Sequence, residues 1–145
     1  MLDKIKEINN ALVYMHNYII EAEKDALVNS PYNELTFTEI HVIEAVGIEP
    51  KTMKEVASKL KITMGSLTTS VNRIVQKGYI ERKFDKADRR RIFINLTPRG
   101  VEVYNFHEIF HENIIGEITK ALEEINPEVL NIELQKLVDV FQRAE

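Results

Sequence analysis

The stretch that decides the fold runs from Thr52 to Thr97: TMKEVASKLKITMGSLTTSVNRIVQKGYIERKFDKADRRRIFINLT. Two amphipathic segments flank a short turn at residues 61–62, and the second starts after Thr63 and stops near Gly78. Residues 79–84 and 91–96 read as two strands, the second with alternating side chains, and residues 85–90 form a charged loop between them. This order predicts a helix-turn-helix followed by a β-hairpin wing.

The second helix of this pair has one apolar side and one side of small polar residues, which suits a helix that lies in a groove of DNA. Serine and threonine reach phosphates or base edges, asparagine can read adenine, and arginine can bond guanine or a phosphate. The alternative is a solvated helix face. The candidate DNA contacts on this helix are Ser66, Thr68, Thr69, Asn72, Arg73 and Lys77.

The hairpin loop ends in Arg89 and Arg90, and Arg91 follows directly. Three adjacent arginines repel one another unless an anion arrives, so a role in DNA binding is the preferred interpretation over a solvated hairpin tip. Together with the helix, they predict a protein that grips a double helix through both grooves.

The charge distribution supports that prediction, although the whole chain of 145 residues has a net charge of −4. Residues 51–100 hold 13 Lys and Arg against 4 Asp and Glu, whereas the rest of the chain holds 6 against 19. Affinity for a polyanion depends on the face that is presented, so the basic middle can bind DNA within an acidic protein.

The rest of the chain predicts helices on either side of this lobe. Apolar residues repeat at steps of three and four along residues 2–28, more than a small core needs, which indicates a partner subunit. We expect a mainly α single domain, 1–145, with a winged helix-turn-helix lobe at about 36–97. Residues 1–28 and 98–145 would form the dimerisation region of a homodimer.

Composition excludes several other classes. The chain has no cysteine, which removes disulfides and thiol nucleophiles and fits a reducing, cytoplasmic location. No segment approaches the roughly 20 apolar residues of a membrane span, so no membrane partner is expected. The absence of a nucleophile elbow and of a phosphate-binding glycine loop argues against an enzyme. A winged-helix adaptor that binds no DNA is the better rival, and the arginine run disfavours it.

Two segments, TMGSLTTSVNRIVQKGYIER and DKADRRRIFINLTPRG, resemble the MarR family of winged-helix transcription regulators. Within it, LTFTEIHVIEAVG, TMGSLTTS and FHEIFHENI look most like the fatty-acid-synthesis repressors of Gram-positive bacteria. The resemblance implies a repressor on pseudo-palindromic double-stranded DNA, with an acyl chain on acyl carrier protein as corepressor. It also implies that Arg90 enters the minor groove, oriented by an ion pair with Asp88.

The sequence leaves three kinds of effector open: a metal, an acyl chain or a small aromatic acid. His107 and His111 stand four residues apart on one predicted helix, a spacing that suits zinc, and Glu23 and His41 would complete a four-ligand set. This set resembles that of the zinc-sensing MarR repressors, yet the fatty-acid repressors show the same pattern. Histidines that bond carboxylates without a metal are the simpler alternative, and a small aromatic acid is a third possible signal.

A lipid effector would need an apolar cleft between the first, second and fifth helices, although most such residues are ordinary core. The candidate lining residues are Leu12, Met15, Ile19, Ile40, Ile43, Phe106 and Phe110.

Overall fold

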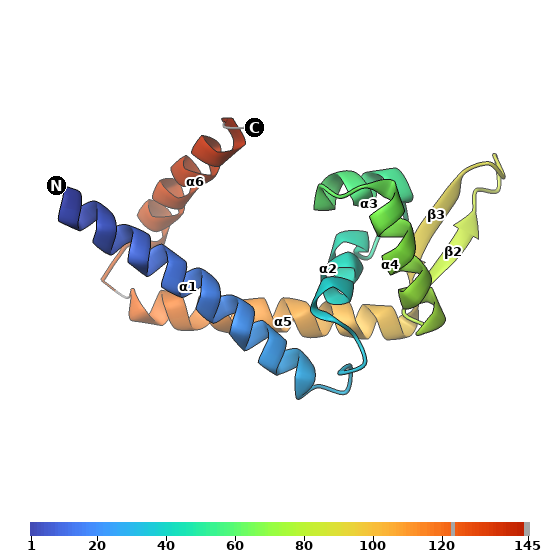
Figure 1. Cartoon of the computed structure of the whole chain (residues 1–145), viewed down its shortest axis with the longest axis horizontal. Helices are drawn as coiled ribbons and strands as arrows, with labels where there is room; N and C mark the ends of the chain where they lie inside the picture. Colours follow the sequence, from blue (N-terminus) through green and yellow to red (C-terminus); the bar gives the residue numbers. More distant parts are fainter. Residues whose placement is uncertain (123, 144–145) are drawn as a thin grey trace. The chain divides into compact units, whose positions relative to one another are not determined.

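The computed structural model describes residues 1–122 and 124–143. Within these residues it contains six helices and a three-stranded antiparallel sheet, so the prediction of a mainly α winged helix-turn-helix is confirmed (Figure 1). The elements are α1 (Leu2–Val28), α2 (Phe37–Val46), β1 (Lys51–Thr52), α3 (Met53–Leu60), α4 (Met64–Gln76), β2 (Ile80–Phe84), β3 (Ile92–Leu96), α5 (Pro98–Ala121) and α6 (Pro127–Arg143).

The chain divides into two compact units, residues 1–110 and residues 111–145, and α5 begins in the first and ends in the second. The first unit holds the helix-turn-helix and the sheet. Whether residues 1–28 and 98–145 together form a dimerisation region stays a prediction. None of the described helices combines the length and the apolar character that a bilayer span requires.

Capping boxes set the start of the two helices that precede α4. The hydroxyl of Thr36 accepts from the amide of Glu39, and the Glu39 carboxylate accepts from the Thr36 amide at 2.8 Å. Thr52 and Glu55 repeat this arrangement at the start of α3. Both pairs satisfy backbone donors that a helix leaves unbonded at its first turn.

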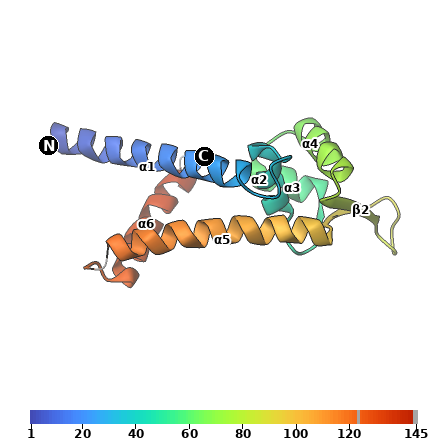
Figure 2. The ribbon, with the colours of Figure 1, turned by 90° about the horizontal axis from the view of Figure 1, so that it is seen from below.

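The sheet has the order β1-β3-β2, and its first strand was not predicted. Strand β1 is only two residues long, with Lys51 opposite Ile94 and Thr52 opposite Phe93 of β3. Strands β2 and β3 pair from Ile80 with Leu96 to Phe84 with Ile92. The tip of this hairpin extends beyond the helices of the lobe (Figures 1 and 2).

The core of the first unit is apolar and lies where α2, α3 and α4 meet the sheet. Side chains from each of these elements are fully or almost fully buried, and Val103 adds one from α5. Each Å² of apolar surface that is removed from water stabilises the fold by about 25 cal/mol, so this burial is the main source of the lobe's stability. The largest fully buried members are Tyr79, Ile40, Ile43, Leu67, Ile74, Ile80 and Ile94.

Helix α5 starts in close contact with the end of the helix-turn-helix. The hydroxyl of Thr97 donates to the carbonyl of Gly78 at 2.7 Å, and its amide donates to the carbonyl of Tyr79 at 3.0 Å. A side chain cannot fit at Gly100, because a Cβ there would lie 2.0 Å from the Tyr79 carbonyl oxygen. The position of α5 is therefore tied to the backbone that joins α4 to β2.

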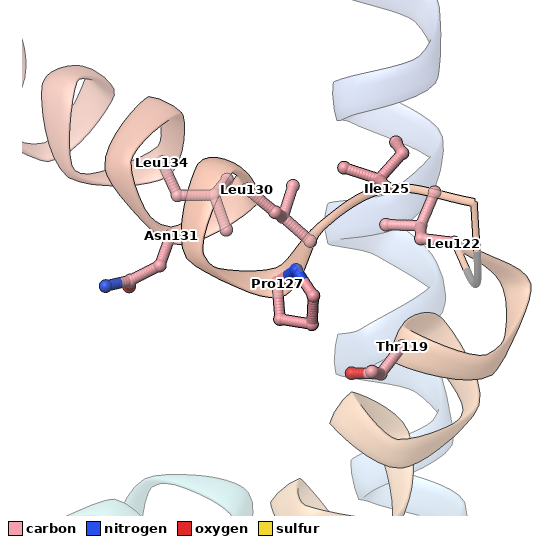
Figure 3. Close-up of a pocket in the computed structure, with 7 residues that line it drawn as sticks. All are labelled: Thr119, Leu122, Ile125, Pro127, Leu130, Asn131 and Leu134. Atoms are coloured by element: carbon pink, nitrogen blue, oxygen red, sulfur yellow. The ribbon is translucent and has the colours of Figure 1, made fainter.

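In the second unit, the end of α5 and the start of α6 enclose a small apolar pocket of about 150 Å³. Leu122, Ile125 and Leu130 gather there at the turn between the two helices (Figure 3). The side chain of Asn126 accepts from the Glu128 amide at 2.8 Å and so starts α6. Helix α5 ends at Ala121.

Candidate nucleic-acid interface and effector cluster

Helix α4 lies between α3 and the β2–β3 hairpin (Figure 1). Its apolar side anchors it, because Leu67, Val71 and Ile74 are all fully buried. Thr63 starts the helix by accepting from the amide of Ser66 at 3.1 Å. The opposite side of α4 is left to solvent, and every candidate contact predicted from Ser66 to Arg73 is exposed.

The hydroxyl groups on this exposed side have defined roles. Thr68 donates to the carbonyl of Met64 at 2.7 Å, and Thr69 donates to the carbonyl of Gly65 at 3.1 Å. The hydroxyl protons of both threonines are therefore used within the helix. Each threonine side chain still offers its hydroxyl oxygen as an acceptor, and its methyl group, to a partner outside the helix. The hydroxyl of Ser66 accepts from Thr63 at 3.0 Å, so its own proton can be donated to a phosphate or a base.

Asn72 lies one helical turn further along the same side of α4. Its Oδ1 accepts a 2.6 Å hydrogen bond from Nη2 of Arg82 on β2. Arg73 is exposed beside it. Arg82 follows Asn72 by ten residues, in another element, so the sequence pattern gave no sign of this bond.

The wing tip is built from two aspartates that bond backbone amides. Asp85 accepts from the amide of Ala87 at 2.8 Å, and Asp88 accepts from the amide of Arg90 at 3.0 Å. The bond described between Asp88 and Arg90 thus goes to the backbone amide rather than to the guanidinium that the resemblance implied. Asp88 shapes the turn, while the side chains of Arg89 and Arg90 are exposed.

An open hollow of about 480 Å³ lies beside the tip, lined by Phe84, Asp85, Lys86 and Arg89. Phe84, at the end of β2, is 65% exposed. The hollow therefore combines two cationic side chains with one exposed ring, next to the exposed arginines.

Lys77, at the end of α4, serves the fold instead of reaching outward. Its ammonium donates to the carboxylate of Glu39 at 2.6 Å and to the carbonyl of Glu34 at 2.7 Å. Burial alone would raise the pKa of Glu39, but the bonds from Lys77 and Thr36 outweigh it and hold that pKa below 4.5. The charge of Lys77 is thus already paired within the lobe, and its contact with DNA stays a prediction.

Three of the four predicted metal ligands come together in the first unit. The Oε1 atom of Glu23 lies 2.8 Å from Nε2 of His107 and 3.4 Å from Nε2 of His41. Glu23 and His107 are almost fully buried, whereas His41 is partly exposed. His111, the fourth, follows His107 by one turn of α5 and is the first residue of the second unit.

The carboxylate of Glu44 was not predicted as part of this cluster. It lies one turn after His41 on α2, with Oε2 3.9 Å from Nδ1 of His107, and it forms with these histidines a group whose ligand atoms lie within 4.8 Å. The spacing of His41 and Glu44 was visible in the sequence, but the third partner comes from α5, far along the chain. The donors are nitrogens and oxygens, which suit a divalent cation such as zinc.

The predicted apolar cleft is unevenly buried. Ile40 and Ile43 are fully buried in the core, whereas Leu12 and Met15 are 53% and 47% exposed. Ile19, Phe106 and Phe110 are partly buried. An acyl chain could meet the exposed members directly, but Ile40 and Ile43 only if the core opened.

Comparison with known proteins agrees with this geometry. The sequence profile of the MarR family matches residues 34–91, which is the lobe from the loop before α2 to the wing. Over this lobe, the chain belongs to the MarR family.

Three similar proteins match more than four fifths of the chain. The multiple antibiotic resistance protein MarR of Salmonella typhimurium is 28% identical over 128 residues, which are 83% of this chain and 87% of that protein. The transcriptional regulator AdcR of Streptococcus pneumoniae is 25% identical over 143 residues, 96% of this chain and 92% of AdcR. The crystal structure of Streptococcus pneumoniae FabT in complex with DNA matches with a TM-score of 0.83 at 28% identity, covering 97% of this chain and 96% of FabT.

As a MarR-family protein, the chain is a DNA-binding transcriptional regulator and not an enzyme. This decides between DNA binding and the non-DNA adaptor that the sequence alone had left as a rival.

Proposed function

We propose that this MarR-family regulator is a homodimeric repressor that reads a pseudo-palindromic operator and controls genes of fatty-acid synthesis. DNA binding is supported above all by the exposed polar side of α4, which accompanies a wing tip with exposed Arg89 and Arg90. Helix α4 enters the major groove with Ser66, Thr68, Thr69, Asn72 and Arg73, and the wing reaches the adjacent minor groove.

The exposed apolar surface supports a dimer. The first half of α1 carries a row of large apolar side chains, each at least 47% exposed, which water disfavours unless a partner covers them. These residues are Ile5, Ile8, Leu12 and Met15. Since MarR-family regulators bind DNA as dimers, two lobes would read inverted half-sites whose centres lie about 34 Å apart, one turn of DNA.

The fatty-acid assignment rests on two similarities. The motifs at residues 35–47 and 106–114 resemble the fatty-acid-synthesis repressors, and FabT is similar over almost the whole chain at a TM-score of 0.83. We propose an acyl chain on acyl carrier protein as corepressor. Acyl carrier protein is acidic, so the basic lobe, with 13 Lys and Arg in residues 51–100, is the surface that it would approach.

Zinc is the second candidate effector, because the side chains present fit it. Glu23, His41 and His107 bring a carboxylate and two imidazoles from three helices to one place, and Glu44 adds a second carboxylate nearby. A bound zinc would fix α1, α2 and the part of α5 that belongs to the first unit relative to one another. A small aromatic ligand is a weaker candidate, since neither described pocket is lined by the predicted effector residues.

Selection of genomic DNA fragments distinguishes the fatty-acid regulator from the zinc regulator. Untagged full-length protein is mixed with sheared genomic DNA of its source at about 0.15 M salt, and the retained fragments are sequenced. We expect fragments upstream of lipid-synthesis genes, and tighter binding to them when long-chain acyl carrier protein is added. Recovery of metal-transport promoters, with binding that responds to zinc and is abolished in His107→Ala, would instead support the zinc regulator.

A further inference from the structure

We infer that Arg82 sets the sequence preference of α4 by fixing the side-chain amide of Asn72, so that this position reads guanine. The inference rests on the proposed function, in which α4 lies in the major groove. Nη2 of Arg82 donates to Oδ1 of Asn72 at 2.6 Å. Because a guanidinium has only donors, this bond determines that the oxygen of the amide faces Arg82 and that the NH₂ group is the other arm.

Arg82 is held in place by the sheet. It lies on β2 opposite Ile94 of β3, the central strand of the sheet. Successive strand residues alternate between faces, so Arg82 shares a face with Ile80, which is 2% exposed and packs into the core. The side chain of Arg82 is thereby directed along the side of β2 that contacts α4, and its partner Asn72 sits on the exposed side of that helix.

This pairing changes what Asn72 can recognise. A two-bond contact with adenine needs Oδ1 to accept from the N6 amino group while Nδ2 donates to N7. Arg82 competes for that Oδ1, and the pair then offers mainly N–H donors from Nδ2 and from the rest of the guanidinium. The base edge that matches donors is guanine, whose O6 and N7 are both acceptors in the major groove.

The helical turn of α4 that precedes Asn72 offers hydrogen-bond acceptors instead of donors. Thr68 and Thr69 donate their hydroxyl protons to Met64 and Gly65, so they present acceptor oxygens and methyl groups. These groups match amino-bearing bases and the thymine methyl. Helix α4 thus has an acceptor turn followed by a donor turn, and guanine is expected at the base pair under the second one.

Binding-site selection from a random duplex library tests the inference, with full-length wild type, Asn72→Ala, Arg82→Ala and the double variant. Lys83→Ala is the matched control, because it removes one charge from the next residue of β2, whose ammonium pairs with Glu81 at 2.5 Å. We expect a guanine at one position of each wild-type half-site. Each single variant loses that preference by about 10-fold or more, and the double variant loses no more than either.

Lys83→Ala should weaken binding but keep the guanine. A wild-type consensus with adenine at that position, or an Arg82→Ala consensus identical to wild type, would overturn the inference while leaving sequence-specific binding intact. A wild type that selects no consensus would contradict the proposed function itself. Thermal unfolding of each variant identifies any that fails to fold. If Arg82→Ala does not fold, Asn72→Ala still tests the inference, because Asn72 is the other partner of the same bond.

Discussion

The guanidinium of Arg99 lies 4.4 Å from the ring centroid of Tyr79, and both side chains bond the carboxylate of Glu34. Arg99 belongs to the first turn of α5, Tyr79 precedes β2, and Glu34 precedes α2. The stacked cation and the shared carboxylate join three segments at the point where α5 leaves the DNA-binding lobe. A shift of α5 would therefore be felt at the end of α4 and at the base of the wing.

Tyr79 should ionise at a higher pH than an ordinary tyrosine. Burial, and then its hydrogen bond to Glu34, raise the pKa of Tyr79 to about 12. The neutral phenol stabilises the fold at every pH below about 10, and this contribution is lost as the pH rises from about 10 towards 12. Phenolate absorbance of the five tyrosines should show one late step that Tyr79→Phe removes. A late step that persists in Tyr79→Phe would show that another tyrosine is responsible.

The ion pair of Glu39 and Lys77 should make stability fall in acid. The pKa of Glu39 is lowered in the fold, so its stabilising effect is complete above about pH 4.5 and is lost as the pH falls through the lowered value. Glu39→Gln keeps a capping residue at this position but loses the charge, and we expect a cost of about 2 kcal/mol at pH 7. Urea unfolding at matched protein concentration should show the gap to wild type shrinking below pH 4.5; a constant gap down to pH 3 would contradict the assignment.

Gly100→Ala should destabilise the lobe. The new methyl would lie 2.0 Å from the Tyr79 carbonyl oxygen, so the start of α5 must move, at a cost of about 3 kcal/mol. Gly116→Ala is the matched control in the same helix, since nothing lies within 4 Å of its Cβ position. Alanine favours helix over glycine, so the control should be neutral or more stable by up to about 1 kcal/mol. Equal melting temperatures for the two variants would refute the close packing at Gly100.

The wing should add affinity for DNA without controlling dimer formation. Arg90→Ala is expected to lower operator affinity by about 1–3 kcal/mol and to reduce the salt slope by about 1. Lys136→Ala, which removes the same charge from an exposed lysine paired with Glu133 on α6, should leave affinity nearly unchanged. Fluorescence anisotropy across a salt series measures the affinity and the salt slope of each variant. Identical curves for Arg90→Ala and wild type would remove the wing from the mechanism.

The sequence predicted features that depend on neighbours along the chain. The capping pairs Thr36 with Glu39 and Thr52 with Glu55 lie three residues apart, so their helices could be placed almost to the residue. Strand β1 was not predicted, because two residues are too few to show an alternating pattern and its partner in β3 is about forty residues away.

The roles of charged side chains were harder to predict than the elements that carry them. The basic character of Lys77 and Arg82 was plain from the sequence, but their partners Glu39 and Asn72 were not, since long-range side-chain pairing leaves no periodic trace. Glu44 was missed for the same reason, because its histidine partner His107 lies on α5.

Regulation by this protein requires paired basic lobes that recognise a specific duplex. The most direct measurement is the affinity of the purified dimer for its selected operator and for a scrambled duplex of equal length and composition, at about 0.15 M salt. We predict at least about 10³-fold tighter binding to the operator, in a complex of two chains per duplex. Equal affinity for both duplexes, or a single chain that binds the full site, would contradict the account.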